Sequence, residues 1–372
     1  MSSDPEPPPA QQQPDHEPTH EDLSQSALAT FSSLRRILLT ITPVILLFSG
    51  IGGFTRGLQA CNQAHGTSFR VVVAIDNDPL ALEVHQLNFP TVPCLQFTLG
   101  HSHKTLYDKL AEYLPRDSWP ESYWHASPSC KASSRANLNH RDVAAGIELT
   151  RWTLRFFRNA SPAVGAYSIE QEPSLAYAMT SLLPHMRVLD MHDYTSDLMC
   201  NRRRLIGSNL SLNLPRVATQ PPSAQKRFGR KYGFPDKTLI MKSSFGNTRL
   251  ASLPTFTITS SPLQIGPHAS ELVPLRPEDT ALILTWSDIQ WPEDWPEGRK
   301  TPYLAQVVPP SFAQVFGLQI ANAMPDRTDY TTAYRESVIS SVTDPAHLLI
   351  RTDFEFANAV AAVDPQSRQV VW

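Results

Sequence analysis

The chain has 372 residues and a formal net charge of −3, and 41% of its residues are hydrophobic. This length predicts one large domain with a smaller companion, because a chain of this size can bury a large core. The four cysteines are far apart and form no C-x-x-C pair, which argues against structural zinc and favours a reducing, intracellular location. We therefore expect no metal.

Residues 1–33 are rich in proline and glutamine and lack the apolar residues that a core needs, so we expect a disordered tail. Residues 1–34 contain six acidic side chains and no Lys or Arg, so the remaining chain carries a net charge of +3. The folded part is therefore mildly basic, which is compatible with a nucleic-acid partner.

Residues 34–48 contain an apolar stretch that follows Arg35 and Arg36. The stretch is too short to span a bilayer, contains Pro43 and leads directly into a glycine-rich turn. We interpret it as a buried strand and expect neither a signal peptide nor a membrane segment.

The sequence LFSGIGGF, residues 47–54, follows this strand and precedes a second apolar strand that ends in Asp76. Its glycines are Gly50, Gly52 and Gly53. Glycines let the backbone bend tightly and approach a ligand, and Asp76 can accept hydrogen bonds from both hydroxyls of a ribose. The combination predicts a cofactor that contains adenosine.

The glycine spacing separates two such cofactors. A dinucleotide fingerprint needs a third glycine three positions after the second, but residue 55 is Thr and the next glycine is Gly57. S-adenosylmethionine has no phosphate and needs only the close backbone approach. The spacing therefore favours S-adenosylmethionine over a nicotinamide cofactor, and a purely structural turn is the remaining alternative.

Three further groups follow this cradle in the sequence. Cys130 lies in a small, polar stretch after a Ser-Pro-Ser turn, unlike a typical core thiol. Glu170 ends an apolar stretch in SIEQEP, and Arg202 and Arg204 in CNRRRLIG would project to the same side of an extended segment. A thiol, a carboxyl group and paired arginines suggest covalent attack on an electron-poor ring.

These motifs resemble, in order, those of the DNA cytosine-5 methyltransferase family. LFSGIGGF resembles its cofactor motif, AIDNDPLALEVHQLNFP its ribose-binding segment, SPSC its nucleophile motif, EQEP its Glu-Asn-Val-Pro motif and NRRRLIG its Gln-x-Arg-x-Arg segment. LPTFTIT, LTWSDIQWP and AQVVPPSFAQVFG are similar to its closing motifs. The resemblance implies an α/β fold with a Rossmann-like, mostly parallel sheet in a methyltransferase domain, together with a smaller target-recognition domain.

The resemblance also implies a chemistry for the site. Cys130 would add to carbon 6 of cytosine, Glu170 would bridge ring nitrogen 3 and the exocyclic amine, and the two arginines, Arg202 and Arg204, would hold the base carbonyl and a phosphate. The substrate implied is cytosine flipped out of duplex DNA. The implied contacts of S-adenosylmethionine are Phe48, Ser49, Gly50, Gly52, Gly53, Asp76, Asn77 and Gln306.

The same resemblance suggests how the chain is divided. We expect an acidic tail (1–33), a catalytic domain (34–207), a recognition domain (208–279), closing motifs that return to the catalytic domain (280–329) and a C-terminal extension (330–372). In the recognition domain, basic residues interleave with aromatic ones, a pattern that suits a nucleic-acid backbone. The expected DNA contacts are Lys226, Arg227, Arg230 and Lys231.

Several positions depart from the family pattern, among them Leu46, Lys131, Gln171 and Gln306. The nucleophile, the carboxylate and both alternate arginines are kept, so we predict a divergent, active and monomeric enzyme. Two alternatives stay open: a catalytically silent relative that binds DNA, and an enzyme that methylates RNA cytosine by the same chemistry.

The pattern of apolar residues predicts the local elements of the catalytic domain. We expect helices at residues 56–63, 79–87, 143–157 and 309–323, and strands at 70–75 and 167–170. Alternation of this kind builds a largely parallel sheet with the ligand at the strand ends.

Overall fold

The computed structural model describes residues 41–129, 142–176, 183–218, 223–243, 246–259 and 261–324. Cys130, Lys131 and the predicted tails 1–33 and 330–372 lie outside the described residues. The chain up to Ala321 belongs to one compact unit, and of the second unit, Asn322–Trp372, only the first three residues are described.

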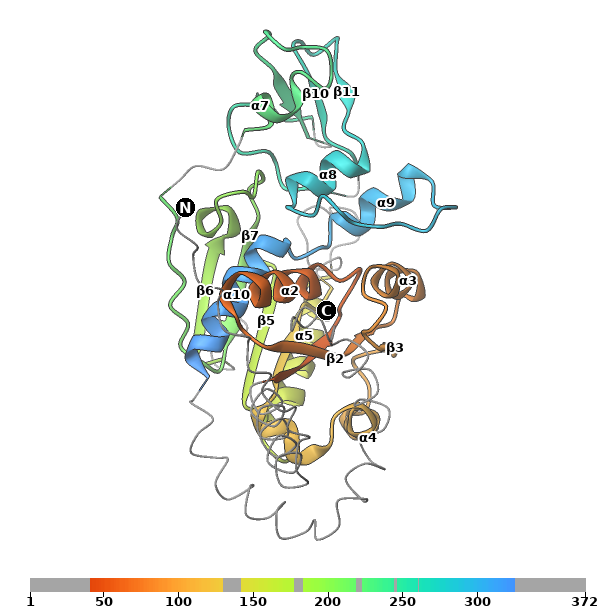
Figure 1. Ribbon diagram of the computed structural model, residues 1–372, viewed down its shortest axis with the longest axis vertical. Helices are drawn as coiled ribbons and strands as arrows, with labels where there is room; N and C mark the ends of the chain where they lie inside the picture. The colour runs from red at the N-terminus through yellow and green to blue at the C-terminus, as the bar shows by residue number, and fades with distance from the viewer. Residues whose placement is uncertain are drawn as a thin grey trace, which may run out of the picture. The chain divides into compact units, whose positions relative to one another are not determined.

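A seven-stranded sheet with the strand order β3-β2-β1-β4-β5-β7-β6 forms the centre of the first unit (Figure 1). Its strands are β1 (Thr42–Leu47), β2 (Phe69–Asp76), β3 (Cys94–Gln96), β4 (Tyr123–Ala126), β5 (Ala166–Gln171), β6 (His185–Asp190) and β7 (Arg203–Ser208). Strands β1 to β5 pair in parallel, whereas β7 runs antiparallel to both of its neighbours. This arrangement confirms the predicted mostly parallel α/β fold.

Helices cover both faces of the sheet. They are α2 (Gly53–His65), α3 (Pro79–Asn88), α4 (His103–Tyr113), α5 (Val143–Arg158) and α10 (Pro310–Ala323). Successive strand residues face opposite sides, so Ile45 and Leu47 join the core cluster that includes residues of α4 and α5. On the other face α2 and α10 lie side by side (Figure 1). Their approach at Gly57 is so close that a Cβ there would lie 2.5 Å from the Pro310 carbonyl oxygen.

Short 3-10 helices connect several of these elements. They are η1 (Arg116–Glu121), η2 (Pro173–Leu175) and η3 (Met191–Tyr194).

Local sequence features explain where the helices begin. Asp78, Ser102 and Asp142 accept hydrogen bonds from backbone N–H groups in the first turns of α3, α4 and α5. Each element predicted within the described residues is present, whereas the first part of the strand predicted at residues 34–48 lies outside them and β1 begins at Thr42. Helix α2 begins three residues earlier than expected, inside the glycine turn, because Gly52 adopts the left-handed conformation at its N-cap.

A second, antiparallel sheet of four strands has the order β11-β10-β8-β9. Its strands are β8 (Ile240–Lys242), β9 (Thr248–Leu250), β10 (Gln264–Gly266) and β11 (Val273–Pro274). Three further helices are α7 (Ala224–Phe228), α8 (Pro277–Ile283) and α9 (Glu297–Leu304). Within the described ranges, no helix has the length and apolar character needed to cross a membrane.

Candidate active site

The parallel strands bring three predicted motifs to one edge of the sheet. Leu47 at the end of β1 is paired with Ala126 at the end of β4, and Ala126 is paired with Ile169 of β5. The glycine turn, the segment that leads to Cys130, and Glu170 therefore leave the sheet at the same edge. In parallel α/β sheets this edge is where ligands bind.

The glycine turn has an unusual backbone. Phe48 has a φ of 54°, a left-handed conformation that costs energy for a residue other than glycine, and Gly50 and Gly52 also have positive φ values. A Cβ on Gly52 would lie 2.5 Å from the Phe89 ring. Strain of this kind persists where the surrounding structure enforces it, commonly at ligand-binding turns.

Asp76 holds the glycine turn against β2. Its Oδ2 accepts a hydrogen bond from the Gly50 N–H at 2.9 Å, and its Oδ1 accepts one from the Asp78 N–H at 3.1 Å. Burial raises the pKa of this carboxyl group. Each carboxylate oxygen can accept more than one hydrogen bond, so the structural bonds leave capacity for the predicted ribose contact.

Ser49 supplies the polar atom of the turn that lacks a partner. Its Oγ is buried and has no hydrogen-bond partner among the described residues. Asn77, the other polar residue predicted to contact the cofactor here, is exposed. Gln306 is also exposed, and its Nε2 donates to the Pro302 carbonyl of its own turn.

Two residues that the sequence analysis missed brace the cradle. His85 of α3 lies with Nδ1 3.3 Å from the Gly50 carbonyl oxygen and Nε2 3.0 Å from Thr55 Oγ1, and burial lowers its pKa to about 4. Tyr303 of α9 donates a hydrogen bond to Asp78 Oδ2 at 3.0 Å. Asp78 also caps α3.

Glu170 and Arg204 form a buried ion pair. Arg204 Nε lies 2.8 Å from Glu170 Oε1, and the two residues are 9% and 6% exposed. Arg202 is 2% exposed, and its guanidinium donates to the Ala305 carbonyl at 3.1 Å. Arg203, between them, is exposed, so the alternation expected of an extended segment is present.

Gln171 connects β5 to the segment that leads to Cys130. Its buried Nε2 donates to the Pro128 carbonyl at 3.3 Å and to Thr150 Oγ1 at 3.1 Å. Glu172, the other acid of EQEP, accepts from the Ser174 N–H at 2.7 Å as the cap of η2. The structure therefore gives Glu170 the buried position and Glu172 a capping role.

The four basic residues expected to contact DNA are not equivalent. Lys226 and Arg227 of α7 are exposed, as is Arg230 after the helix. Lys231 forms an ion pair with the buried Asp279 at the start of α8, which also accepts from the Tyr232 hydroxyl. Much of the Lys231 charge is therefore neutralised within the protein.

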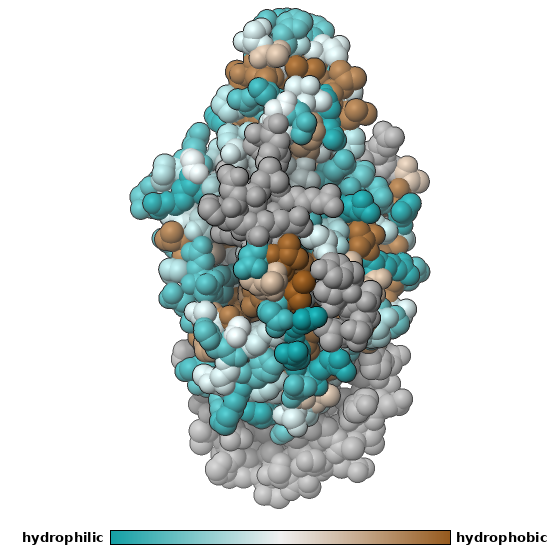
Figure 2. All heavy atoms as spheres, turned by 180° about the vertical axis from the view of Figure 1, so that it is seen from behind, coloured by the Kyte–Doolittle hydropathy of each residue, from teal (hydrophilic) through white to brown (hydrophobic). Residues whose placement is uncertain are grey.

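The surface of the second sheet mixes hydrophilic and hydrophobic residues. Figure 2 shows brown residues among teal ones at the end of the molecule that this sheet occupies. Leu250 of β9 and Leu253 in the turn after it are 47% and 51% exposed.

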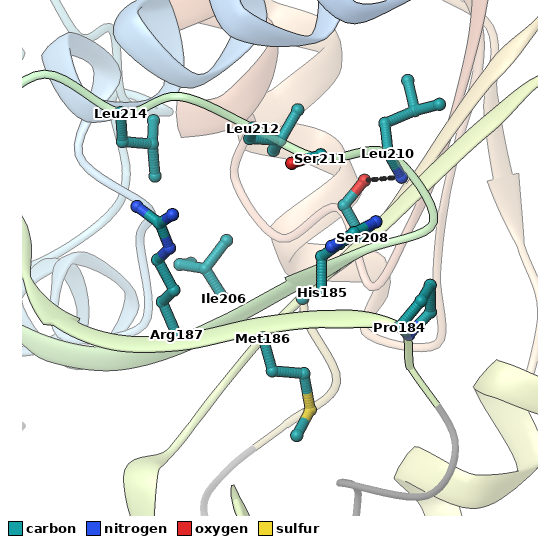
Figure 3. Close-up of a pocket in the computed structure, with 11 residues that line it drawn as sticks. Pro184, His185, Met186, Arg187, Ile206, Ser208, Leu210, Ser211, Leu212 and Leu214 are labelled. Carbon is teal, nitrogen blue, oxygen red and sulfur yellow. Dashed lines mark hydrogen bonds between the residues drawn. The ribbon is translucent and has the colours of Figure 1, made fainter.

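A hollow of about 180 Å³ lies elsewhere, at the β6–β7 end of the seven-stranded sheet (Figure 3). Arg187 and Ile206 line it together with Leu210, Leu212 and Leu214 from the segment after β7. The glycine turn follows β1, three strands away from β7 in the sheet order, so the hollow is not part of the candidate active site.

Comparisons with known proteins agree with this geometry. Residues 43–111 match the family model described as C-5 cytosine-specific DNA methylase. No curated protein sequence matches the chain.

Two solved structures share the fold. One is a putative DNA modification methyltransferase encoded within a prophage of Escherichia coli, with 13% identity, a TM-score of 0.52, and 77% of this chain and 100% of that chain covered. The other is a mutant form of DNMT2 from Spodoptera frugiperda, with 12% identity, a TM-score of 0.51, and 76% of this chain and 99% of that chain covered.

Proposed function

We propose that the chain, of which residues 43–111 match the model of the C-5 cytosine-specific DNA methylase family, transfers a methyl group from S-adenosylmethionine to carbon 5 of cytosine in duplex DNA. The observation that carries the proposal is the buried Glu170–Arg204 pair, which lies next to Gln171 and so beside the segment that leads to Cys130.

The glycine turn fits the cofactor. The unpartnered Ser49 hydroxyl, the left-handed backbone at Phe48 and Gly50, and the carboxylate of Asp76 are the groups that would hold it. Bound S-adenosylmethionine supplies an electrophilic methyl group. The two carboxylate oxygens of Asp76 would accept the ribose hydroxyls while they keep their bonds to the backbone.

Carbon 5 of cytosine is a poor nucleophile, so the proposed route begins with the Cys130 thiolate. The sulfur forms a bond to carbon 6, the electrons of the carbon 5–carbon 6 double bond become available at carbon 5, and nitrogen 3 takes a proton. Glu170 is the group that would deliver or share that proton, and Arg204 fixes its orientation. Methyl transfer would form the bond from carbon 5 to the methyl carbon and break the bond from that carbon to the sulfonium sulfur. Loss of the carbon 5 proton to solvent would then re-form the double bond and release the Cys130 thiolate from carbon 6, and nitrogen 3 would return its proton to Glu170.

The nucleic acid would contact the smaller antiparallel sheet and α7. Lys226, Arg227 and Arg230 are exposed cations that suit phosphates. Cytosine would have to leave the helix stack to reach the Cys130 thiol, so base flipping is part of the proposal. RNA cytosine is the alternative substrate, because the same chemistry would serve it.

A labelled-methyl assay distinguishes these possibilities. Purified protein would be incubated with methyl-labelled S-adenosylmethionine and either duplex DNA or transcribed RNA, and the nucleosides would then be separated. We expect label in 5-methyldeoxycytidine. Label only in 5-methylcytidine from RNA would assign the alternative substrate, and label in neither would contradict the proposed activity.

A further inference from the structure

His125 of β4 contacts residues from three segments of the proposed site: the helix after the glycine turn, the segment that leads to Cys130, and the strand that carries Glu170. Its ring stacks on Phe54 of α2, with centroids 3.7 Å apart and an interplanar angle of 11°. Its Nδ1 lies 2.7 Å from Ser168 Oγ and its Nε2 lies 2.9 Å from Ser127 Oγ. Both ring nitrogens are therefore engaged at hydrogen-bond distance.

The ring is a fixed dipole and not a proton carrier. His125 is buried, and burial lowers its pKa to about 3. A neutral imidazole has one donor and one acceptor nitrogen, so it donates to one serine and accepts from the other. Tyr123 contributes its hydroxyl to the same network, 2.6 Å from Ser168 Oγ.

Each partner of the ring belongs to a different functional segment. Ser127 is in the segment that leads to Cys130, and its N–H donates to the Leu47 carbonyl just before the glycine turn. Ser168 is two residues before Glu170 on β5. Phe54 follows the last glycine of the turn.

Backbone pairing alone does not set these spacings. The register of β4 and β5 places His125 opposite Ser168, but β4 ends at Ala126, so Ser127 is beyond the paired region. Two side chains tie the segment after β4 to its surroundings: His125 through Ser127, and Gln171 through the Pro128 carbonyl.

We propose that His125 is a positioning residue for methyl transfer, which fixes the segment that leads to the nucleophile relative to the strand that carries Glu170 and to the cofactor helix. The inference rests on the proposed function. It assigns His125 no contact with the reacting atoms.

Three substitutions separate the two hydrogen bonds of the ring. The side-chain amide of Gln reaches about as far as Nε2 and that of Asn about as far as Nδ1, whereas Phe keeps the stack and removes both bonds. We expect His125→Asn and His125→Phe to lower kcat about 10- to 100-fold, the usual result of misplaced reacting groups. We expect His125→Gln, which can still reach Ser127, to keep most of the activity.

The accompanying readouts distinguish positioning from a general structural role. The KM for S-adenosylmethionine should change little in all three variants, because the glycine turn and Asp76, which would hold the cofactor, are kept. Ser127→Ala should lose as much as His125→Asn, and the double variant should lose no more than either single one. Tyr107→Phe, which removes a partly buried hydrogen bond from the hydroxyl to the Phe156 carbonyl, is the control for stability.

A second readout needs no nucleic acid. The rate at which iodoacetamide alkylates Cys130, followed by mass spectrometry of its peptide, should rise in His125→Asn and His125→Phe and stay near the wild-type rate in His125→Gln and Tyr107→Phe.

The two readouts separate the two hypotheses. If wild-type protein methylates nothing but the alkylation order holds, the proposed function fails, whereas the structural part of the inference stands: His125 fixes the segment that leads to Cys130. Equal effects of Asn and Gln in both assays, or losses that follow only the melting temperature, would overturn the positioning role.

Discussion

Two buried histidines should make the fold sensitive to mild acid. Burial lowers the pKa of His85 to about 4 and that of His125 to about 3, whereas a histidine in the unfolded chain has a pKa of 6.5. Between these values the unfolded state binds more protons than the folded state. Stability is therefore complete above pH 6.5 and falls as the pH is lowered toward 4.

The size of the effect follows from the pKa differences. At pH 5 an unfolded histidine is almost fully protonated and the buried one is almost fully neutral, so each histidine lowers the free energy of unfolding by about 2 kcal/mol relative to pH 8, and both together by about 4 kcal/mol. Asp76 acts in the opposite sense, because its pKa is raised by burial and the folded state binds its proton more readily. The histidine contribution is therefore best measured as the difference between wild type and a histidine variant in the unfolding free energy lost on acidification.

Urea unfolding at pH 8 and pH 5 gives this difference directly. Wild-type protein should lose more stability on acidification than His85→Gln, by about 2 kcal/mol. An identical pH dependence of unfolding in wild type and variant would refute the reasoning.

Three further outcomes follow from named contacts. Gly57→Ala should lower stability by about 1 to 3 kcal/mol in thermal unfolding, because the new Cβ would lie 2.5 Å from the backbone of α10. Glu170→Gln should keep DNA affinity and lose about a hundredfold in methyl-transfer rate, whereas Glu172→Gln, at the cap of η2, should stay close to wild type. Arg227→Ala should lower the slope of log affinity against log salt by about one unit, but Lys231→Ala should lower it less, since Lys231 is paired with Asp279.

The sequence predicted the parts of the fold that depend on local pattern. β1 and β2 are apolar runs that end in a glycine turn and an acid, and α5 has a clear helical period, so these elements could be identified without tertiary information. The place of Glu170 at the ligand-binding edge was also predictable, because Glu170 ends a predicted parallel strand and ligands bind at the carboxyl ends of such strands.

Contacts between distant segments could not be predicted in this way. Tyr303 reaches Asp78 across 225 positions, and His85 reaches the Gly50 carbonyl only because α3 folds back beside the turn. Tyr303 lies outside the motifs named above, and no spacing rule assigns a role to His85 within residues 74–90. An acid can cap a helix and face a second element at once, as Asp78 does, and only the tertiary structure reveals both partners.

The basic segment shows a second limit of sequence patterns. Lys226 and Lys231 look alike in a run of cations and aromatic residues, but only Lys231 faces the buried carboxylate of Asp279. A charge pattern does not record whether a cation is already paired. Whether Lys226, Arg227 and Arg230 contact a nucleic acid is a matter for the salt-dependence measurement above.

Covalent trapping tests the central proposal, cytosine-5 methylation through Cys130, most directly. Duplex DNA that contains 5-fluorocytosine would be incubated with the protein and S-adenosylmethionine, and the adduct would be located by peptide mapping. Fluorine at carbon 5 prevents the final elimination, so we predict a stable adduct at the Cys130 peptide that is lost in Cys130→Ser. An adduct that persists in Cys130→Ser, or methylated cytosine formed without any trapped protein, would contradict the account.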